Sequence, residues 1–408
     1  MSYLGELRQH SRPLTAASLG GGVSLPFFAY TNTVFSPHLI AEFGWSRAQF
    51  ALVGLTMLAT LLVLPFIGRF TDQLGVRRIA LIGTLLLPLC FVGYAVQQGS
   101  FGFFLLCSTL VLMTGAMTSP LVYSRLIAEN FHQAQGLALT VMNCIPALLA
   151  IPAVPMLNWI IDTYGWRSGY LGLGAVVLIV GLLAVVLVPA DARPAQDSTA
   201  GTARQRDGGP QPGDFALILR SKVFWIIFAG MFLCVLQTPL HAAQMNLMLM
   251  ENGLTTKTAA SVVSIYAAGT IVGRIGCGLA LDRYPTHLVT AISMGFPALG
   301  YFLLATDLNT MPVIVAAMFL VGVSVGAESD LLSFLVARYF KLRIYNTTLS
   351  LLFVCSFAGS ACGALAISGT LRLADSYSPF MYLVAITITV GCLMFLALPR
   401  PQDADRIG

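Results

Sequence analysis

Charged side chains are scarce in this chain. Only 10% of its 408 residues are Asp, Glu, Lys or Arg, and 57% are hydrophobic. Average soluble domains carry about 25% charged and roughly 45–50% apolar residues. A soluble fold of this length could not hide so much apolar surface from water. Lipid must therefore be the solvent for much of the chain.

Other chemical signatures are also missing. The glycine-rich stretches GRFTDQ and GGGVS lack a P-loop lysine and its strand context. All eight cysteines fall inside apolar stretches and have no metal-ligand spacing. The net charge is +5, but the basic residues form short clusters between apolar segments and no continuous patch. We therefore expect no cofactor, no metal, no nucleic-acid partner and no enzymatic activity.

Long apolar runs dominate what remains. A helix needs about 20 predominantly apolar residues to span the hydrocarbon, and lipid leaves no partner for an unpaired backbone group. Twelve segments meet that length and are predicted to be helices. They are 14–35, 47–69, 79–98, 101–124, 134–160, 168–190, 223–249, 257–281, 288–306, 311–335, 344–371 and 378–399.

The loop charges predict the orientation. With a cytoplasmic N-terminus, seventeen of the 22 Lys and Arg residues fall on the cytoplasmic side and four on the other. Positive charge marks the cytoplasmic loops of membrane proteins. We therefore expect a multi-pass protein of the inner (plasma) membrane with both termini in the cytoplasm. The remaining cation, Arg274, lies inside a predicted span.

The chain reads as two similar halves. Residues 191–221 are rich in Pro, Gly, Asp and Arg, which predicts a flexible cytoplasmic linker between residues 1–190 and 222–408. Short motifs recur across the linker at an offset of 209 or 210 residues. The recurring positions are Gly44 and Gly253, Gly68-Arg-Phe-Thr-Asp72 and Gly278-Leu-Ala-Leu-Asp282, and Phe131 and Phe340.

Residues 68–78, GRFTDQLGVRR, resemble the loop 2–3 signature of the major facilitator superfamily. Gln73 and Val76 depart from its basic preference, and the second copy has Pro285 where a glycine belongs. The resemblance implies an all-α membrane fold of twelve helices in two pseudo-symmetric six-helix halves. Within that superfamily the chain looks like the branch of monocarboxylate transporters and the oxalate/formate antiporter. The motifs are FGWSRAQ at 43–49, YGWRSGYL at 164–171, IVGRIGCGLALDR at 271–283 and ARYF at 337–340.

The loop 2–3 signature suggests a conformational latch. Gly68 permits close helix contact, and Asp72 can cap a neighbouring helix N-terminus or pair with an arginine. Such contacts would exist in one conformational state and break in another. Arg77 and Arg78 could instead serve only to set the topology. The predicted latch residues are Gly68, Asp72, Arg77, Arg78, Asp282 and Arg283.

Arg274 is the strongest site candidate. It lies eight residues before Asp282, which marks the predicted membrane edge, so it is about 12 Å deep. An arginine at that depth needs a cavity or a counter-charge. The matching residue in the first half is Leu64, so the fold does not require a cation there. The resemblance implies that this arginine binds a substrate carboxylate; the alternative is a permanent ion pair with Glu328 or Asp330.

Glu328 and Asp330 lie in the tenth predicted span. Two acids in one span are costly and usually functional. Their i, i+2 spacing points them about 200° apart on a helix. One could neutralise Arg274 or carry a coupling proton, and the sequence leaves open which.

Polar residues in three other spans complete the candidate binding site. In the seventh span Gln237, His241 and Gln244 share a helical face, and Pro239 favours a local break. His241 could relay a proton, bind an anion or simply bond between helices. At the repeat offset, Asn32 is the counterpart of His241, and Tyr30 lies two residues before it in the sequence. The resemblance suggests Tyr123 as a further candidate. Packing is the alternative role for both tyrosines.

Together these observations predict a secondary transporter that works by alternating access near the membrane midplane. The expected substrate is a small organic anion, a mono- or dicarboxylate, carried with protons or in exchange for another anion. The alternatives are an efflux carrier for lipophilic or cationic compounds and a transporter-like receptor. The lipid bilayer is the expected environment, and we expect a monomer.

Overall fold

The helices fall into two compact units. The structure is a computed structural model that describes residues 3–32, 34–45, 56–189, 213–306, 310–374, 376–399 and 407. The first unit is Met1–Pro212 with Lys341–Ser350, and the second is Gly213–Phe340 with Leu351–Gly408. The described residues form helices and one isolated bridge between Phe340 and Ile407, so the all-α expectation is confirmed. The predicted boundary between residues 190 and 191 lies outside the described part.

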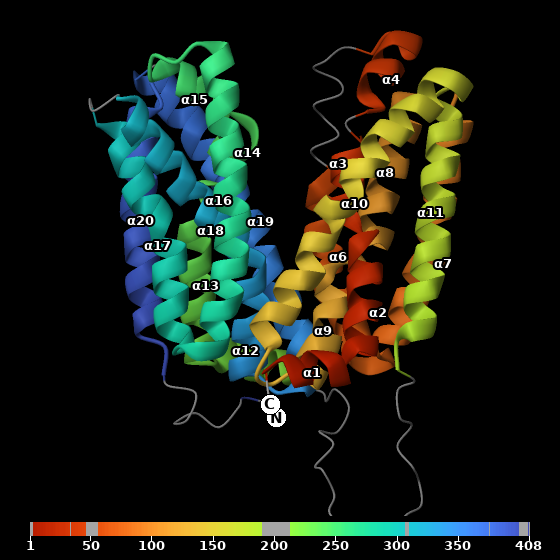
Figure 1. Ribbon diagram of the computed structural model, residues 1–408, viewed down its shortest axis with the longest axis horizontal. Helices are drawn as coiled ribbons and strands as arrows, with labels where there is room; N and C mark the ends of the chain where they lie inside the picture. The colour runs from red at the N-terminus through yellow and green to blue at the C-terminus, as the bar shows by residue number, and fades with distance from the viewer. Residues whose placement is uncertain are drawn as a thin grey trace, which may run out of the picture. The chain divides into compact units, whose positions relative to one another are not determined.

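The first unit holds the helices of the N-terminal half (Figure 1). They are α1 (Tyr3–Gln9), α2 (Ser11–Gly22), α3 (Leu25–Asn32), α4 (Ser36–Phe43), α6 (Thr56–Leu74), α7 (Val76–Val96), α8 (Phe101–Ala116), α9 (Pro120–Asn130), α10 (Gln135–Tyr164) and α11 (Trp166–Leu187). The short 3-10 helix η2 (Leu342–Ile344) and the first residues of α19 (Tyr345–Ala374) also belong to this unit.

The second unit holds the remaining helices (Figure 1). They are α12 (Asp214–Arg220), α13 (Lys222–Val235), α14 (Thr238–Ala243), α15 (Met245–Glu251), α16 (Thr256–Arg283), α17 (Thr286–Ala305), α18 (Met311–Tyr339), the rest of α19 and α20 (Ser378–Leu396). Here α16 packs along α18, and α17 packs against both α18 and α20. Residues 214–220, which the sequence assigns to a flexible linker, form a helix that leads directly into α13.

Ten stretches of the described residues are long and apolar enough to cross a membrane. They correspond to ten of the twelve predicted spans. The first predicted span, 14–35, is divided between α2 and α3, with a break at Val23 and Ser24. The second, 47–69, begins outside the described residues, and its later part is in α6. The fold is thus that of a multi-pass membrane protein.

Small residues let α2 approach its neighbouring helices closely. A Cβ atom added to Gly20 would overlap the ring of Tyr123 in α9, and one added to Gly22 would meet Ile145 of α10 at 2.5 Å. Helices in lipid associate through such close packing because the hydrophobic effect does not drive them together there. The triple glycine at residues 20–22 therefore fixes α2 against α9 and α10.

The internal repeat is visible in local backbone geometry. Gly44 and Gly253 both have positive φ, at 65° and 85°. Phe131 and Phe340 each cap a helix C-terminus in extended conformation, donate a backbone hydrogen bond to the residue four positions earlier, and are fully buried. Matched conformations at a constant offset support the duplication inferred from sequence.

Candidate functional site

Two glycine pairs bring α16 and α18 into backbone contact. A Cβ on Gly273 would overlap the carbonyl oxygen of Val323, and a Cβ on Gly326 would overlap that of Thr270. Each helix thus carries the small-xxx-small pattern that lets membrane helices approach closely. The four glycines of this contact are Gly269, Gly273, Gly322 and Gly326.

This contact positions an ion pair inside the second unit. Arg274 directly follows Gly273, and Asp330 lies one helical turn beyond Gly326. Arg274 Nη1 donates to Asp330 Oδ1 at 3.5 Å; the arginine side chain is 18% exposed and the aspartate is fully buried. A buried charge without a partner would be strongly destabilising. Of the two acids that the sequence offered as the counter-charge, the structure pairs Asp330. Substrate contact by Arg274 stays a prediction.

Glu328 occupies a different side of α18. It is half-buried and lies two residues before Asp330 on this helix. Within the described residues, no hydrogen bond or ion pair is found for its carboxyl group. The i, i+2 spacing therefore separates the two acids as expected, and only Asp330 meets Arg274.

The seventh predicted span is broken where Pro239 suggested. It divides into α13, α14 and α15, and Pro239 occupies the first turn of α14. His241 is buried with its Nδ1 3.5 Å from the Tyr301 hydroxyl of α17, and its ring lies 5.8 Å from that of Tyr266. Tyr266 is two helical turns from Arg274 along α16. His241 therefore joins α14 to α16 and α17 through these two tyrosines.

The two glutamines near His241 have different surroundings. Gln237 is buried, and its side-chain oxygen has no hydrogen-bond partner within the described residues. The side-chain oxygen of Gln244, at the junction of α14 and α15, accepts from the Tyr377 hydroxyl at 2.8 Å. An unpaired buried amide is costly unless a hydrogen bond to water or a ligand satisfies it.

In the described part of the chain, no three His, Cys, Asp or Glu side chains are grouped as a metal site would need.

The candidates of the first unit lie in unlike environments. Tyr30 in α3 is 50% exposed, and Asn32 at the end of α3 is half-buried. Tyr123 is fully buried against Gly20, and its hydroxyl has no partner among the described residues. Packing thus explains the position of Tyr123. Substrate contact by any of the three stays a prediction.

Asp72 is the centre of a dense polar cluster in the first unit. Its Oδ1 accepts from the Asn346 backbone N–H at 3.1 Å, and its Oδ2 accepts from the Thr347 backbone N–H at 2.7 Å. Arg125 of α9 pairs with Oδ1 at 2.7 Å. The carboxylate thus occupies the N-terminus of α19, where unpaired N–H groups and the helix dipole favour an anion. Both contacts that the sequence suggested for Asp72 are present.

The other predicted latch residues lie in α6, α7 and α16. A Cβ on Gly68 would overlap the Asn346 carbonyl oxygen, so the glycine allows α19 to approach α6. In the first turn of α7, Arg77 is half-buried and Arg78 is exposed. In the second copy, Asp282 is half-buried and Arg283 is exposed at the end of α16. Release of these contacts during transport stays a prediction.

Three further carboxylates hold loops in place, and the sequence analysis missed them. Glu6 in α1 accepts from the backbone N–H groups of His132, Gln133 and Ala134 at 2.8–2.9 Å, just before α10. Burial raises the pKa of Glu6, but these three donors lower it more, so the net pKa lies below its ordinary value. Glu6 thus fixes the N-terminal helix onto the loop between α9 and α10.

The other two acids are repeat-mates. Glu42 accepts from Trp166 Nε1 and, at 3.0 Å, from Arg167 Nη1. Glu251 accepts from the Tyr377 backbone N–H at 3.0 Å. In the first half, the acid near the end of α4 therefore holds the start of α11. In the second half, the acid that ends α15 holds the start of α20. Their shared offset of 209, equal to that of Gly44 and Gly253, was the sequence signal that could have identified them.

The chain belongs to the Major Facilitator Superfamily, whose sequence model matches residues 17–326 and 242–407. Crystal structures of two sugar carriers support this fold. The E. coli fucose:proton symporter FucP superposes with a TM-score of 0.70 at 13% identity, over 97% of this chain and 98% of its own. The proton:xylose symporter XylE gives a TM-score of 0.71 at 12% identity, over 98% and 96%. The protein is therefore a secondary transporter and not an enzyme.

Curated relatives differ in what they carry. The 4-hydroxybenzoate transporter PcaK of Pseudomonas putida is 22% identical over 229 residues, 50% of this chain and 51% of its own length. The match thus spans about half of that relative. The multidrug resistance protein MdtL of Salmonella heidelberg is 22% identical over 324 residues, 78% of this chain and 79% of its own. The two relatives are named for different solutes, so they leave the solute of this chain open.

Proposed function

We propose that this transporter moves a small organic anion, a mono- or dicarboxylate, by alternating access. The observation that supports it is the Arg274–Asp330 pair inside the membrane-spanning part of the second unit. A guanidinium has five N–H donors in a planar fork that matches a carboxylate, so one protein carboxylate does not exhaust its capacity. Asp330 then serves as the counter-charge when no substrate is bound.

The same pair favours transport coupled to protons. Arg274 and Asp330 are together neutral, so a bound substrate anion would bring one net negative charge into a medium of low dielectric constant. Uptake of one proton by a nearby acid removes that charge. By linkage, anion and proton then strengthen each other's binding. Glu328, which has no cation partner among the described residues, is the proposed proton carrier, and exchange of anions is the alternative.

Replacing Glu328 with Gln tests the proton role. We expect Glu328→Gln to lose uptake driven by a proton gradient, by about tenfold or more, because the amide cannot release a proton. Exchange of labelled for unlabelled substrate across proteoliposomes should persist at a rate independent of pH. Asp162→Asn, which changes an exposed acid of α10, is the matched control. Gradient-driven uptake by Glu328→Gln at the wild-type rate would contradict the proposal.

The second candidate function is efflux of lipophilic or cationic compounds. It is favoured by the name of the MdtL relative and by the half-buried acid Glu328, which could pair with a cation. The name of PcaK, a carrier of a carboxylate-bearing aromatic, favours the anion. In the anion proposal, Gln237 and His241 are further candidate contacts to the solute within the second unit, and Tyr30, Asn32 and Tyr123 are the candidates of the first unit.

A ligand panel distinguishes the two candidates. Purified protein is heated with small mono- and dicarboxylates, with their neutral amides and with lipophilic cations. A ligand at 100 times its Kd stabilises the folded state by about 2.7 kcal/mol, which is measurable as a higher Tm. We expect one or more carboxylates to raise the Tm while the matched amides do not. Stabilisation by the cations alone would favour the efflux function.

The remaining proposals follow from the topology and the polar cluster at Asp72. The protein acts as a monomer in the inner membrane with both termini in the cytoplasm, the side where its basic loop residues accumulate. The latch residues Gly68, Asp72, Arg77, Arg78, Asp282 and Arg283 form contacts that are made in one state of the transport cycle and released in another.

A further inference from the structure

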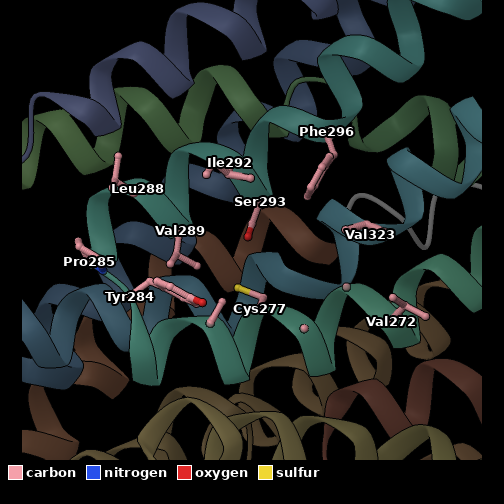
Figure 2. A pocket seen from close by; sticks show the side chains of 13 residues that line it. Val272, Cys277, Tyr284, Pro285, Leu288, Val289, Ile292, Ser293, Phe296 and Val323 are labelled. Carbon is pink, nitrogen blue, oxygen red and sulfur yellow. The ribbon is translucent and has the colours of Figure 1, made fainter.

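The second unit contains an apolar groove apart from the charged pair. It lies between α16 and α17, and Val323 of α18 also lines it (Figure 2). Its volume is about 470 Å³. On the α16 side the groove is lined by Gly273 and Gly276, which have no side chains to fill it. On the α17 side it is lined by Val289 and Phe296. Ligand sites in proteins are typically ~300–1,000 Å³. The groove is therefore large enough for part of a ligand.

The rim of this groove is apolar and exposed. Both α16 and α17 are candidate spans, and the apolar rim is exposed, with Val272 53% and Ile292 60% accessible. Along α17 the exposed residues Leu288, Ile292 and Leu299 recur at helical spacing, which is the pattern of a lipid-facing stripe. An exposed apolar rim on two candidate spans favours contact with hydrocarbon, from which an apolar chain can enter the groove sideways.

One end of the groove is polar and adjoins a cationic residue. Tyr284 and Pro285 close it where α16 ends, and Tyr284 is 65% exposed (Figure 2). Arg283, the last residue of α16, is exposed beside it. Tyrosine and arginine at the end of a span are typical of the level of the lipid headgroups. The charge there complements a phosphate and not a cation.

We propose that the groove binds one phospholipid, with an acyl chain between α16 and α17 and its phosphate at Arg283 and Tyr284. Inside the groove the side chains of Cys277 and Ser293 point toward each other (Figure 2), and the other lining residues are almost entirely apolar. The lining therefore suits a hydrocarbon chain and offers no charged partner for a carboxylate solute. This lipid site is independent of which solute the protein carries.

Gly276 allows the groove to be filled without disturbing the helix packing. A Cβ on Gly276 would meet no atom within 4 Å, whereas one on Gly273 would overlap α18. Gly276→Phe should therefore fold and displace the acyl chain. Gly369→Phe is the matched control, because Gly369 of α19 is also exposed, is equally open and lies outside the groove.

The test is native mass spectrometry of delipidated protein titrated with phosphatidylglycerol in detergent micelles. We expect wild type and Gly369→Phe to retain one tightly bound phosphatidylglycerol, and Gly276→Phe to bind it about tenfold more weakly through loss of a few buried methylenes. Arg283→Gln should weaken phosphatidylglycerol about fivefold relative to phosphatidylcholine. Equal binding by Gly276→Phe and wild type would overturn the proposal. So would reduced solute transport by Gly276→Phe with unchanged lipid binding, because the groove would then be a solute path.

Discussion

Replacing Arg274 with Ala is expected to lower kcat/KM for carboxylate uptake by about 100-fold or more. A charge-assisted, bidentate hydrogen bond in a low-dielectric site is lost, and each ~1.4 kcal/mol of lost interaction is tenfold in rate. Arg274→Lys keeps the charge but loses the planar fork, so an intermediate loss of about tenfold is expected. Uptake of the labelled acid into proteoliposomes measures both variants.

Arg274→Ala also lowers the stability of the protein, and this effect must be separated from the loss of substrate binding. Arg274→Ala leaves Asp330 buried without its cation, which costs about 3–5 kcal/mol of stability. The double variant Arg274→Ala/Asp330→Asn removes both charges and should recover most of that stability. Its Tm should approach that of wild type while uptake stays low. Wild-type uptake by a folded double variant would remove the anion-binding role of Arg274.

Replacing Gly273 with Leu is expected to destabilise the second unit by about 3 kcal/mol or more. The new side chain would start where the Val323 carbonyl oxygen lies, so α16 and α18 would have to separate. Separation also pulls Arg274 away from Asp330. The expected result is a strongly reduced yield of monodisperse protein and a lower Tm in detergent.

Gly276→Leu is the control for this experiment. It makes the same chemical change one turn of α16 away, at a position with open space around it. Both variants gain the same helix propensity, so a difference between them reports only the contact with α18. We expect Gly276→Leu to be as stable as wild type or more stable by up to about 1 kcal/mol. Equal stability of the two variants would show that the close α16–α18 contact is not needed.

Residue pattern alone predicted the features that depend on one segment at a time. Apolar length identified the spans, and Pro239 predicted the break between α13 and α14. The motif around Asp72 suggested a helix cap or an arginine partner, and the structure has both contacts. The sequence could not name the partners, because Arg125 and Thr347 are 53 and 275 residues away along the chain.

The pairing of Arg274 illustrates the limit of that reasoning. Spacing predicted that Glu328 and Asp330 point to opposite sides of a helix but not which of them faces α16. The small-xxx-small patterns of α16 and α18 held the missing information, since the register of the glycine contact determines which acid is opposite Arg274. For Glu42 and Glu251, the shared repeat offset was visible, but their loop partners were not.

The sequence by itself determined the solvent, the helices and the superfamily, because hydropathy and short motifs are properties of contiguous residues. Only the tertiary structure decided that Asp330 neutralises Arg274, that Glu328 lies apart from it, and that an apolar groove opens between α16 and α17. The physical reason is that charge pairing and cavities depend on how closely two distant helices approach, and single glycines set that distance here.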